Sequence, residues 1–220
     1  MNELALRAAI IATAIQMNDR RINSGKSGNV SARTETGFLI TPTGLAYGTM
    51  RPEDIVAVTL GGAATGPRLP SSEWRFHRDI YVDRPEGGAI VHAHSPFATT
   101  LACLGRGIPA FHYMVAIAGG KDIRCAPYAT FGTQELSDGT LVALSGRRAC
   151  LLANHGMIAV DASLEAALAL AIEVEALAEQ YWRALQIGAP NLLSDTEMDI
   201  VLEKFRNYGQ QAGQTRSSRR

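Results

Sequence analysis

The sequence predicts an α/β protein with three layers, in which a mixed and mostly antiparallel central sheet lies between two layers of helices. The first observation is that short apolar segments typical of strands occur in pairs and clusters, and do not alternate strictly with helices. The second is that segments with helical spacing lie at both ends of the chain and between these clusters. Paired strands favour antiparallel neighbours, and interspersed helices favour cover on both faces of the sheet.

Helices are predicted where apolar residues recur at helical spacing behind a capping residue. Leu4, Ala8 and Ile11 share one face of the first such segment. Ser95 and Pro96 begin another in the favoured way, with a capping hydroxyl and a proline in the first turn. The predicted helices cover residues 3–20, 71–81, a segment from residue 95 onward, 163–187 and 194–208.

Strands are predicted where short β-branched and apolar runs lie between turn-forming residues. The first two runs are close enough along the chain to form a hairpin, whereas residues 61–70 are rich in glycine and proline and are expected to form a loop. The predicted strands cover residues 30–33, 37–41, 55–59, 89–94, 111–115, 123–128, 149–153 and 157–160.

Composition and charge indicate an ordinary globular protein. The chain has 220 residues, with 21 basic and 21 acidic side chains and a pI near 7.0. A chain of this length is expected to form a single domain over residues 1–210, with a flexible basic tail over residues 211–220. Zero formal net charge argues against a protein that coats nucleic acid or an anionic membrane.

The cysteines and the N-terminal segment predict a cytoplasmic protein. Cys103, Cys125 and Cys150 are odd in number and scattered, which fits a reducing compartment better than a disulfide framework. The apolar stretch over residues 8–15 is too short to span a bilayer, and no basic leader precedes it.

Three histidines are candidate metal ligands. His92 and His94 bracket Ala93 on a predicted strand, so the pleat directs both imidazoles to the same face. A shared cation is the natural reason for that arrangement, although one imidazole buried in the core and one capping a helix is an alternative. His155 lies between two predicted strands and would complete a set of three protein ligands with an open catalytic position, or would simply occupy a turn.

Two segments favour an anionic ligand. Residues 25–29 are dense in glycine and polar residues and are expected to form a backbone nest for a phosphate. Ser71 and Ser72 lie at a predicted helix N-terminus, which also attracts anions, although Ser71 alone would be an ordinary cap. Thr43 and Gly44 have the same two interpretations, an anion contact or a turn.

Glu73 follows the two serines, where it would either complement the helix dipole or act as a general acid and base beside a metal and a phosphate. His77 and His112 are expected to be structural.

Taken together, these residues resemble the class II aldolase/adducin family, and in particular its fuculose-1-phosphate aldolase type. The resemblance covers nearly the whole chain outside the basic tail. It rests on motifs that occur in the family's order: Gly28–Asn29, Thr43–Gly44, Ser71–Glu73, His92–His94, Tyr113, Asn154–Gly156 and Phe205–Tyr208.

The resemblance implies a role for each matching residue. His92, His94 and His155 would bind one divalent cation per subunit, usually zinc, with manganese or cobalt as alternatives, and Glu73 would be the acid/base that also approaches the metal. Tyr113 would donate a proton on the aldehyde side, which Phe131, Phe205 and Tyr208 would help to line. The phosphate would be held by Gly28, Asn29, Thr43, Gly44, Ser71 and Ser72. The family's fourfold-symmetric tetramers place sites at subunit interfaces, so a homotetramer is expected.

The function implied is retro-aldol cleavage of a small phosphorylated sugar into dihydroxyacetone phosphate and an aldehyde. Fuculose 1-phosphate and 5-deoxyribulose or 5-methylthioribulose 1-phosphate are the candidate substrates, the latter pair in a salvage role. Ribulose-5-phosphate 4-epimerases share the metal triad but usually carry aspartate in place of the glutamate. A sugar-acid phosphate decarboxylase and an adducin-like structural module are further alternatives.

Overall fold

The computed structural model describes residues 2–206, and within them one eight-stranded sheet has the order β4-β3-β2-β1-β5-β8-β7-β6. Neighbouring strands are antiparallel, except that β6 and β7 are parallel. The predicted mixed, mostly antiparallel sheet is confirmed. Its strands are β1 (Asn29–Arg33), β2 (Gly37–Ile40), β3 (Val56–Thr59), β4 (Ala64–Thr65), β5 (Ala89–Ala93), β6 (Cys125–Ala126), β7 (Ala149–Leu152) and β8 (Gly156–Asp161).

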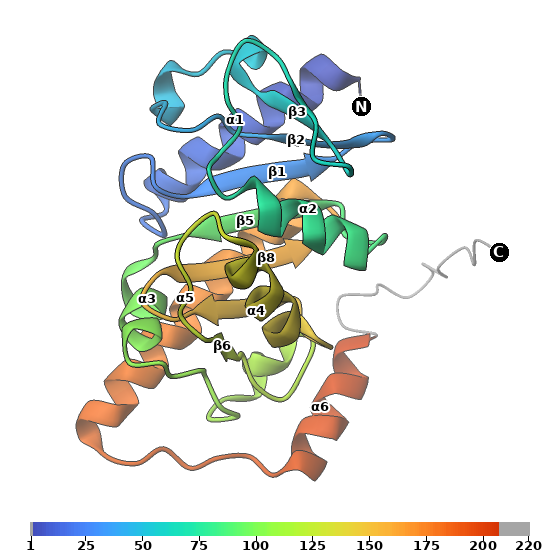
Figure 1. Ribbon diagram of the computed structural model, residues 1–220. Helices are drawn as coiled ribbons and strands as arrows, with labels where there is room; N and C mark the ends of the chain where they lie inside the picture. The colour runs from blue at the N-terminus through green and yellow to red at the C-terminus, as the bar shows by residue number, and fades with distance from the viewer. Residues whose placement is uncertain (1, 207–220) are drawn as a thin grey trace, which may run out of the picture.

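Helices cover both faces of the sheet, and each face has its own apolar core (Figure 1). In β5, Val91 packs into the core beneath α1, α3 and α5, whereas Ile90 packs into the core beneath α2 and α4. Successive side chains of a strand point to opposite faces of the sheet, so β5 contributes to both cores. The two cores confirm the predicted three layers. The helices are α1 (Glu3–Asp19), α2 (Trp74–Asp83), α3 (Pro96–Cys103), α4 (Gln134–Leu144), α5 (Leu164–Ile187) and α6 (Asp195–Arg206), with 3₁₀ turns η1 (Tyr47–Thr49), η2 (Pro52–Asp54) and η3 (Tyr113–Ala118).

The central strands bring together segments that are distant in the sequence. The register pairs Asn29 of β1 with His92 of β5 along one edge of β5. Along its other edge, β8 pairs Ile158 with His92 and Met157 with Ala93. The end of β5 therefore lies between the start of β1 and the start of β8.

The prediction of a strand over residues 111–115 is wrong, because η3 occupies most of that segment. The His112 imidazole accepts a hydrogen bond from the Met114 N–H, which caps a helical turn that local strand propensity does not reveal. His112 is structural in this sense. The loop predicted over residues 61–70 contains the two-residue strand β4, and the strand predicted over 123–128 is reduced to β6, beyond which Pro127 has no N–H for a ladder.

Helix boundaries also differ from the prediction. Helix α4 is not among the predicted helices, and its signal is the Thr133 hydroxyl, which accepts a hydrogen bond from the Leu136 N–H. The helix predicted from residue 71 begins only at Trp74, with Glu73 in the cap position. The last helix was predicted to reach Tyr208, which, like the tail over residues 211–220, lies outside the described residues.

Glu175 of α5, rather than the predicted Ser95 hydroxyl, caps α3. Ser95 makes no side-chain capping bond, whereas the Glu175 carboxylate accepts from the Phe97 and Ala98 N–H groups, at 2.8 Å each. Burial raises the pKa of the Glu175 carboxyl, and the two N–H donors partly oppose that rise. This contact ties α5 to the helix that follows directly after β5.

Replacing Glu175 by alanine is expected to lower the free energy of unfolding by about 1–2 kcal/mol, because two partly buried N–H groups lose their acceptor. Urea unfolding followed by circular dichroism measures the change. Glu179→Ala is the matched control on the same helix, since the Glu179 carboxylate pairs with the largely exposed Arg183 and its loss should cost about 0.5 kcal/mol or less. Equal midpoints for the two variants would contradict the capping role.

Among the described residues, no helix is both long and apolar enough to cross a membrane.

Candidate metal centre

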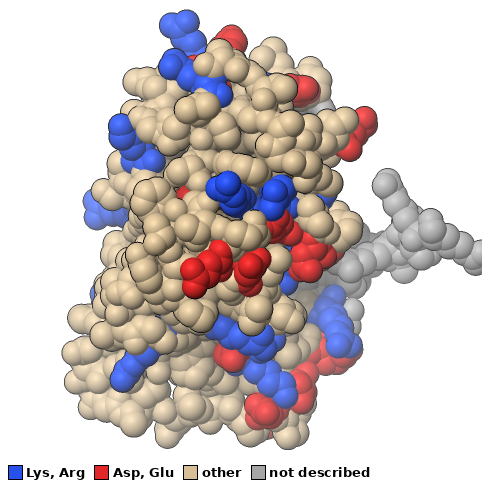
Figure 2. Space-filling view, in the orientation of Figure 1, with Lys and Arg blue, Asp and Glu red and all other residues tan. Residues whose placement is uncertain are grey.

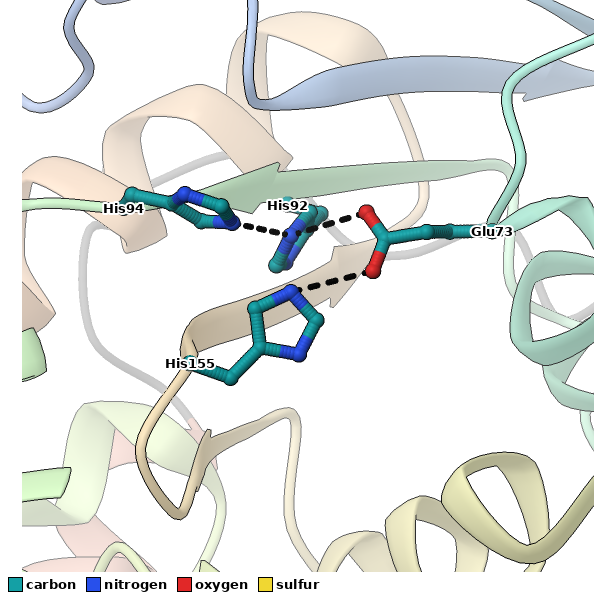
Figure 3. Close-up of side chains that lie close together, drawn as sticks. All are labelled: Glu73, His92, His94 and His155. Carbon is teal, nitrogen blue, oxygen red and sulfur yellow. Dashed lines mark hydrogen bonds and ion pairs between the residues drawn. The ribbon is translucent and has the colours of Figure 1, made fainter. Parts of the chain in front are cut away.

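Four side chains converge at the end of the central strands. Glu73 precedes α2, His92 lies on β5, His94 follows it, and His155 lies in the turn between β7 and β8. One potential ligand atom from each lies within 4.8 Å of the others. Figure 3 shows the three imidazoles and the carboxylate facing a common point. The structure thus brings together all four residues that were expected to bind a metal.

The local backbone explains how His155 reaches this point. Asn154 adopts a left-handed conformation with φ of 55°, which asparagine tolerates better than most residues. A Cβ at Gly156 would lie 2.5 Å from the Ala93 carbonyl oxygen, so only glycine allows β8 to approach the end of β5 this closely. The turn thereby holds His155 against His94, with ring centroids 5.0 Å apart.

Hydrogen bonding leaves the Nε2 atom of His92 directed at the centre. Its Nδ1 lies 2.9 Å from the Met157 carbonyl oxygen, which can only accept, so Nδ1 carries a proton. Nε2 faces both Glu73 Oε2 at 3.1 Å and His94 Nε2 at 3.0 Å. This is the outer contact typical of a metal-binding histidine, in which a backbone carbonyl fixes the tautomer and the ring orientation.

The donor set fits a divalent cation. One proton on His92 Nε2 cannot satisfy both of its neighbours, and Glu73 Oε1 is buried without a hydrogen bond although His155 Nε2 lies 3.0 Å away. A single cation would satisfy all four groups at once. Ligands with bonds of about 2.0–2.1 Å in a tetrahedral site are roughly 3.3 Å apart, close to the separations observed here.

The electrostatics also suit a cation. Burial raises the pKa of the Glu73 carboxyl, but positive charge and hydrogen bonding at His92 and His155 outweigh it and hold the pKa well below its usual range. Burial, followed by the neighbouring His92 and His155, lowers the pKa of His94 to about 3. Glu73 is therefore ionised and His94 neutral near pH 7, the states in which both bind metal.

A cavity of about 250 Å³ opens beside this centre. Its lining includes Ser27, Ser72, Glu73, His94, Phe131 and His155. The volume is suited to a small molecule, and the lining brings a ligand within reach of the Glu73 carboxylate. A larger groove of about 1150 Å³ between α1 and the start of α5 is lined by other residues and lacks this chemistry.

The three segments predicted to hold phosphate are neighbours. Lys26 donates a hydrogen bond to the Gly44 carbonyl oxygen, and the Ser71 N–H donates to the Thr41 carbonyl oxygen. Asn29, which was also predicted to hold the phosphate, directs its side chain to Glu73 instead, with Nδ2 2.8 Å from Oε2.

The predicted helix N-terminus at Ser71 and Ser72 is wrong, because α2 starts at Trp74. Ser71 Oγ instead accepts from the Glu73 N–H at 3.3 Å, and Gly28, Thr43 and Ser72 lie in the adjoining loops.

The residues expected on the aldehyde side are only partly assembled. Phe131 lines the cavity and is 64% exposed. Tyr113 is half exposed on η3 and is not among the described residues that line the cavity. Phe205 lies on α6 and packs against the core beneath α1, α3 and α5, and Tyr208 lies outside the described residues.

His77, which was expected to be structural, is connected to the metal centre through Asn29. Its imidazole is fully buried and hydrogen-bonds Asn29, which in turn holds Glu73. The available signal was spacing, because Glu73 and His77 are four residues apart at the start of a helix and therefore face the same side.

Comparisons with known proteins agree with this site. The family model described as "Class II Aldolase and Adducin N-terminal domain" matches residues 8–182. A 5-methylthioribulose-1-phosphate/5-deoxyribulose-1-phosphate aldolase from Rhodospirillum rubrum is 58% identical over 96% of each chain. An L-fuculose phosphate aldolase from Escherichia coli K12 is 49% identical over 95% of this chain and 98% of its own.

A solved structure of an L-fuculose 1-phosphate aldolase matches with a TM-score of 0.89 and 40% identity, covering 92% of this chain and 96% of that one. Sequence and fold thus match the same group of enzymes along almost their full length. The chain belongs to the class II aldolase and adducin family, and within it to the aldolases.

Proposed function

We propose that this aldolase uses a divalent cation, held by His92, His94, His155 and Glu73, to cleave a ketose 1-phosphate into dihydroxyacetone phosphate and an aldehyde in the cytoplasm. The observation that carries the proposal is the Glu73 carboxylate, which lies 3.0–3.1 Å from two of the imidazoles and lines the adjoining cavity. Zinc suits the three imidazoles and one carboxylate best, and manganese and cobalt are accepted by the same donors.

The bound cation would supply positive charge against the enediolate that develops when the C3–C4 bond breaks. The chain's own residues handle the protons. In the condensation direction, the ionised Glu73 removes a proton from C3, and Tyr113 donates its phenolic proton to the aldehyde oxygen as the C3–C4 bond forms. Cleavage reverses both transfers: Tyr113, as the phenolate, accepts the proton of the C4 hydroxyl while the electron pair of the bond passes to C3, and Glu73, in its protonated form, returns a proton to C3.

Positioning falls to the loops around Glu73. The segments that contain Gly28–Asn29, Thr43–Gly44 and Ser71–Ser72 adjoin one another and would hold the phosphate through N–H and hydroxyl groups. Holding the phosphate fixes C3 with respect to the Glu73 carboxylate, which raises the effective concentration of a correctly oriented substrate.

The substrate we favour is 5-methylthioribulose or 5-deoxyribulose 1-phosphate, in a salvage role, with fuculose 1-phosphate as the second candidate. The 58% identity to the relative named for the first pair supports this choice. The exposed Phe131 ring at the cavity offers an apolar surface for a deoxy or methylthio group.

The site is proposed to be completed between the subunits of a homotetramer. Within one chain, Tyr113 and Phe131 present rings that are 51% and 64% exposed, and only Phe131 lines the cavity. A neighbouring subunit would bring Tyr113, together with Phe205 and Tyr208, to the aldehyde side. Such shared sites would make activity depend on assembly.

Release of dihydroxyacetone phosphate tests the function. Cleavage is measured with 5-methylthioribulose, 5-deoxyribulose and fuculose 1-phosphates and with ribulose 5-phosphate, each with and without a chelator. We expect chelator-sensitive release from the first three, and the highest kcat/KM for the first two. Conversion of ribulose 5-phosphate to xylulose 5-phosphate without release from any ketose 1-phosphate would identify an epimerase instead, and release of carbon dioxide from a sugar-acid phosphate would identify a decarboxylase.

A further inference from the structure

A chain of buried hydrogen bonds leads away from Glu73 into the protein. Asn29 Nδ2 lies 2.8 Å from Glu73 Oε2, and Asn29 Oδ1 lies 2.5 Å from His77 Nε2. On the other side of the ring, His77 Nδ1 lies 2.7 Å from Ser31 Oγ, which lies 2.8 Å from the Tyr81 hydroxyl. Asn29, Ser31, His77 and Tyr81 are all at most 3% exposed. Water therefore does not substitute for these contacts.

The charge on Glu73 determines the direction of every bond in this chain. An ionised carboxylate only accepts, so Asn29 must direct its NH₂ group to Oε2 and its carbonyl oxygen to His77. That oxygen also only accepts, so His77 must carry its proton on Nε2. Nδ1 then accepts from Ser31, and Ser31 Oγ in turn accepts from Tyr81.

The His77 ring suits this one-way arrangement. Burial lowers the pKa of His77 to about 3, with His92 adding to the effect and Glu73 opposing it. The ring is therefore neutral near pH 7, with one donor nitrogen and one acceptor nitrogen. It stacks on Phe76 at a centroid distance of 4.7 Å, which fixes its plane.

We propose that His77 is a positioning residue for the acid/base carboxylate: held by Ser31 and Tyr81, it fixes the Asn29 amide, which holds Oε2 of Glu73 and thereby the orientation of the carboxylate. The other carboxylate oxygen, Oε1, faces His155 Nε2 at 3.0 Å. In each of the four hydrogen bonds the donor lies farther along the chain of bonds from Glu73 than the acceptor does. The N–H and O–H groups therefore all point toward the carboxylate, and their dipoles add in stabilising its negative charge. The kinetic part of this role rests on the proposed aldolase function.

Two substitutions at His77 distinguish the roles of its two ring nitrogens. In His77→Gln, the side-chain amide nitrogen can take the place of Nε2 and donate to Asn29. In His77→Asn, the amide reaches only as far as Nδ1, so the contact with Ser31 is retained and the contact with Asn29 is lost. Both remove the same ring from the same buried position, which makes each the control for the other's loss of packing.

We expect His77→Asn to lower kcat about 10–100-fold with KM changed less than about 2-fold, and to weaken cobalt binding by a similar factor, as outer contacts of metal sites do. His77→Gln should recover most of both losses. Cobalt affinity is read from the visible spectrum of the loaded protein. Equal kcat and equal cobalt affinity in the two variants would overturn the proposal.

The tautomer of His77 tests the proposal in the unaltered protein, without relying on either variant to fold. The ¹⁵N shifts of the ring nitrogens in the zinc-loaded protein are expected to show a proton on Nε2, whereas a proton on Nδ1 would refute the arrangement. This measurement and the cobalt titration do not depend on the reaction. If both agree with the proposal and no ketose 1-phosphate is cleaved, the positioning role stands and only the proposed function fails.

Discussion

Replacing Glu73 by glutamine is expected to lower kcat for cleavage by about 10²–10⁴-fold, because an amide cannot exchange a proton with C3 at neutral pH. Glutamine has almost the same volume and keeps an oxygen that can accept from Asn29. The cavity, the three imidazoles and the fold should therefore persist. Steady-state release of dihydroxyacetone phosphate measures kcat and KM, and circular dichroism confirms that the variant is folded.

The matched control for this variant is Glu86→Gln. Glu86 is an exposed carboxylate in the loop before β5 and lies apart from the metal centre, so the same loss of charge should leave kcat unchanged. If Glu73→Gln kept more than about a tenth of the wild-type kcat, general acid–base catalysis by Glu73 would be ruled out. Glu73 would then serve only as a metal ligand.

Side chains of the candidate metal centre whose direction depends on local geometry are predictable from the sequence. His92 and His94 are directed to one side by the period of a strand, and His155 is set in place by an Asn–His–Gly turn between two strands. The mostly antiparallel sheet is predictable for a similar reason, because hairpin partners such as β1 and β2 are close in sequence. In these cases residues that are close in the sequence determine the contacts found in the folded protein.

Features that depend on tertiary contacts are not predictable in this way. The cap of α3 comes from Glu175, about eighty residues along the chain from the helix that it caps, while the adjacent Ser95 hydroxyl satisfies the local rule but makes no capping bond. Residues 111–115 have strand-like composition, but most of them belong to η3, which packs against α5 and α6. Which group caps a helix, and whether such a segment forms a strand, therefore depends on tertiary contacts.

Charge also includes one property that the sequence predicts and one that depends on the tertiary structure. Figure 2 shows basic and acidic side chains scattered over one face of the protein, which agrees with the zero formal net charge. The carboxylate at the candidate metal centre, Glu73, is instead buried. Its partner Asn29 comes from a strand 44 residues earlier in the chain, so the sequence alone indicates the carboxylate but not the hydrogen-bond chain behind it.

Removing the bound metal is expected to abolish measurable cleavage and to lower the free energy of unfolding. Without a cation, Glu73 Oε1 and the Nε2 atoms of the three histidines remain crowded around an unsatisfied centre. A ligand present at about 1,000 times its dissociation constant adds about 4 kcal/mol of stability, so the melting temperature should fall on chelation and recover when zinc is added back. Differential scanning calorimetry and the cleavage assay measure the two effects on the same samples.

A histidine outside the centre provides the control for this prediction. His155→Asn removes one ligand and should lose most of the bound zinc, along with the stabilisation that added zinc gives. His112→Asn removes an imidazole that caps η3 and is not one of the four converging groups, and asparagine is itself a good cap, so this variant should bind zinc and gain zinc-dependent stability as the wild type does. Zinc-dependent stabilisation of equal size in the two variants would show that the metal binds elsewhere. The four converging side chains would then have to be explained as a buried polar network.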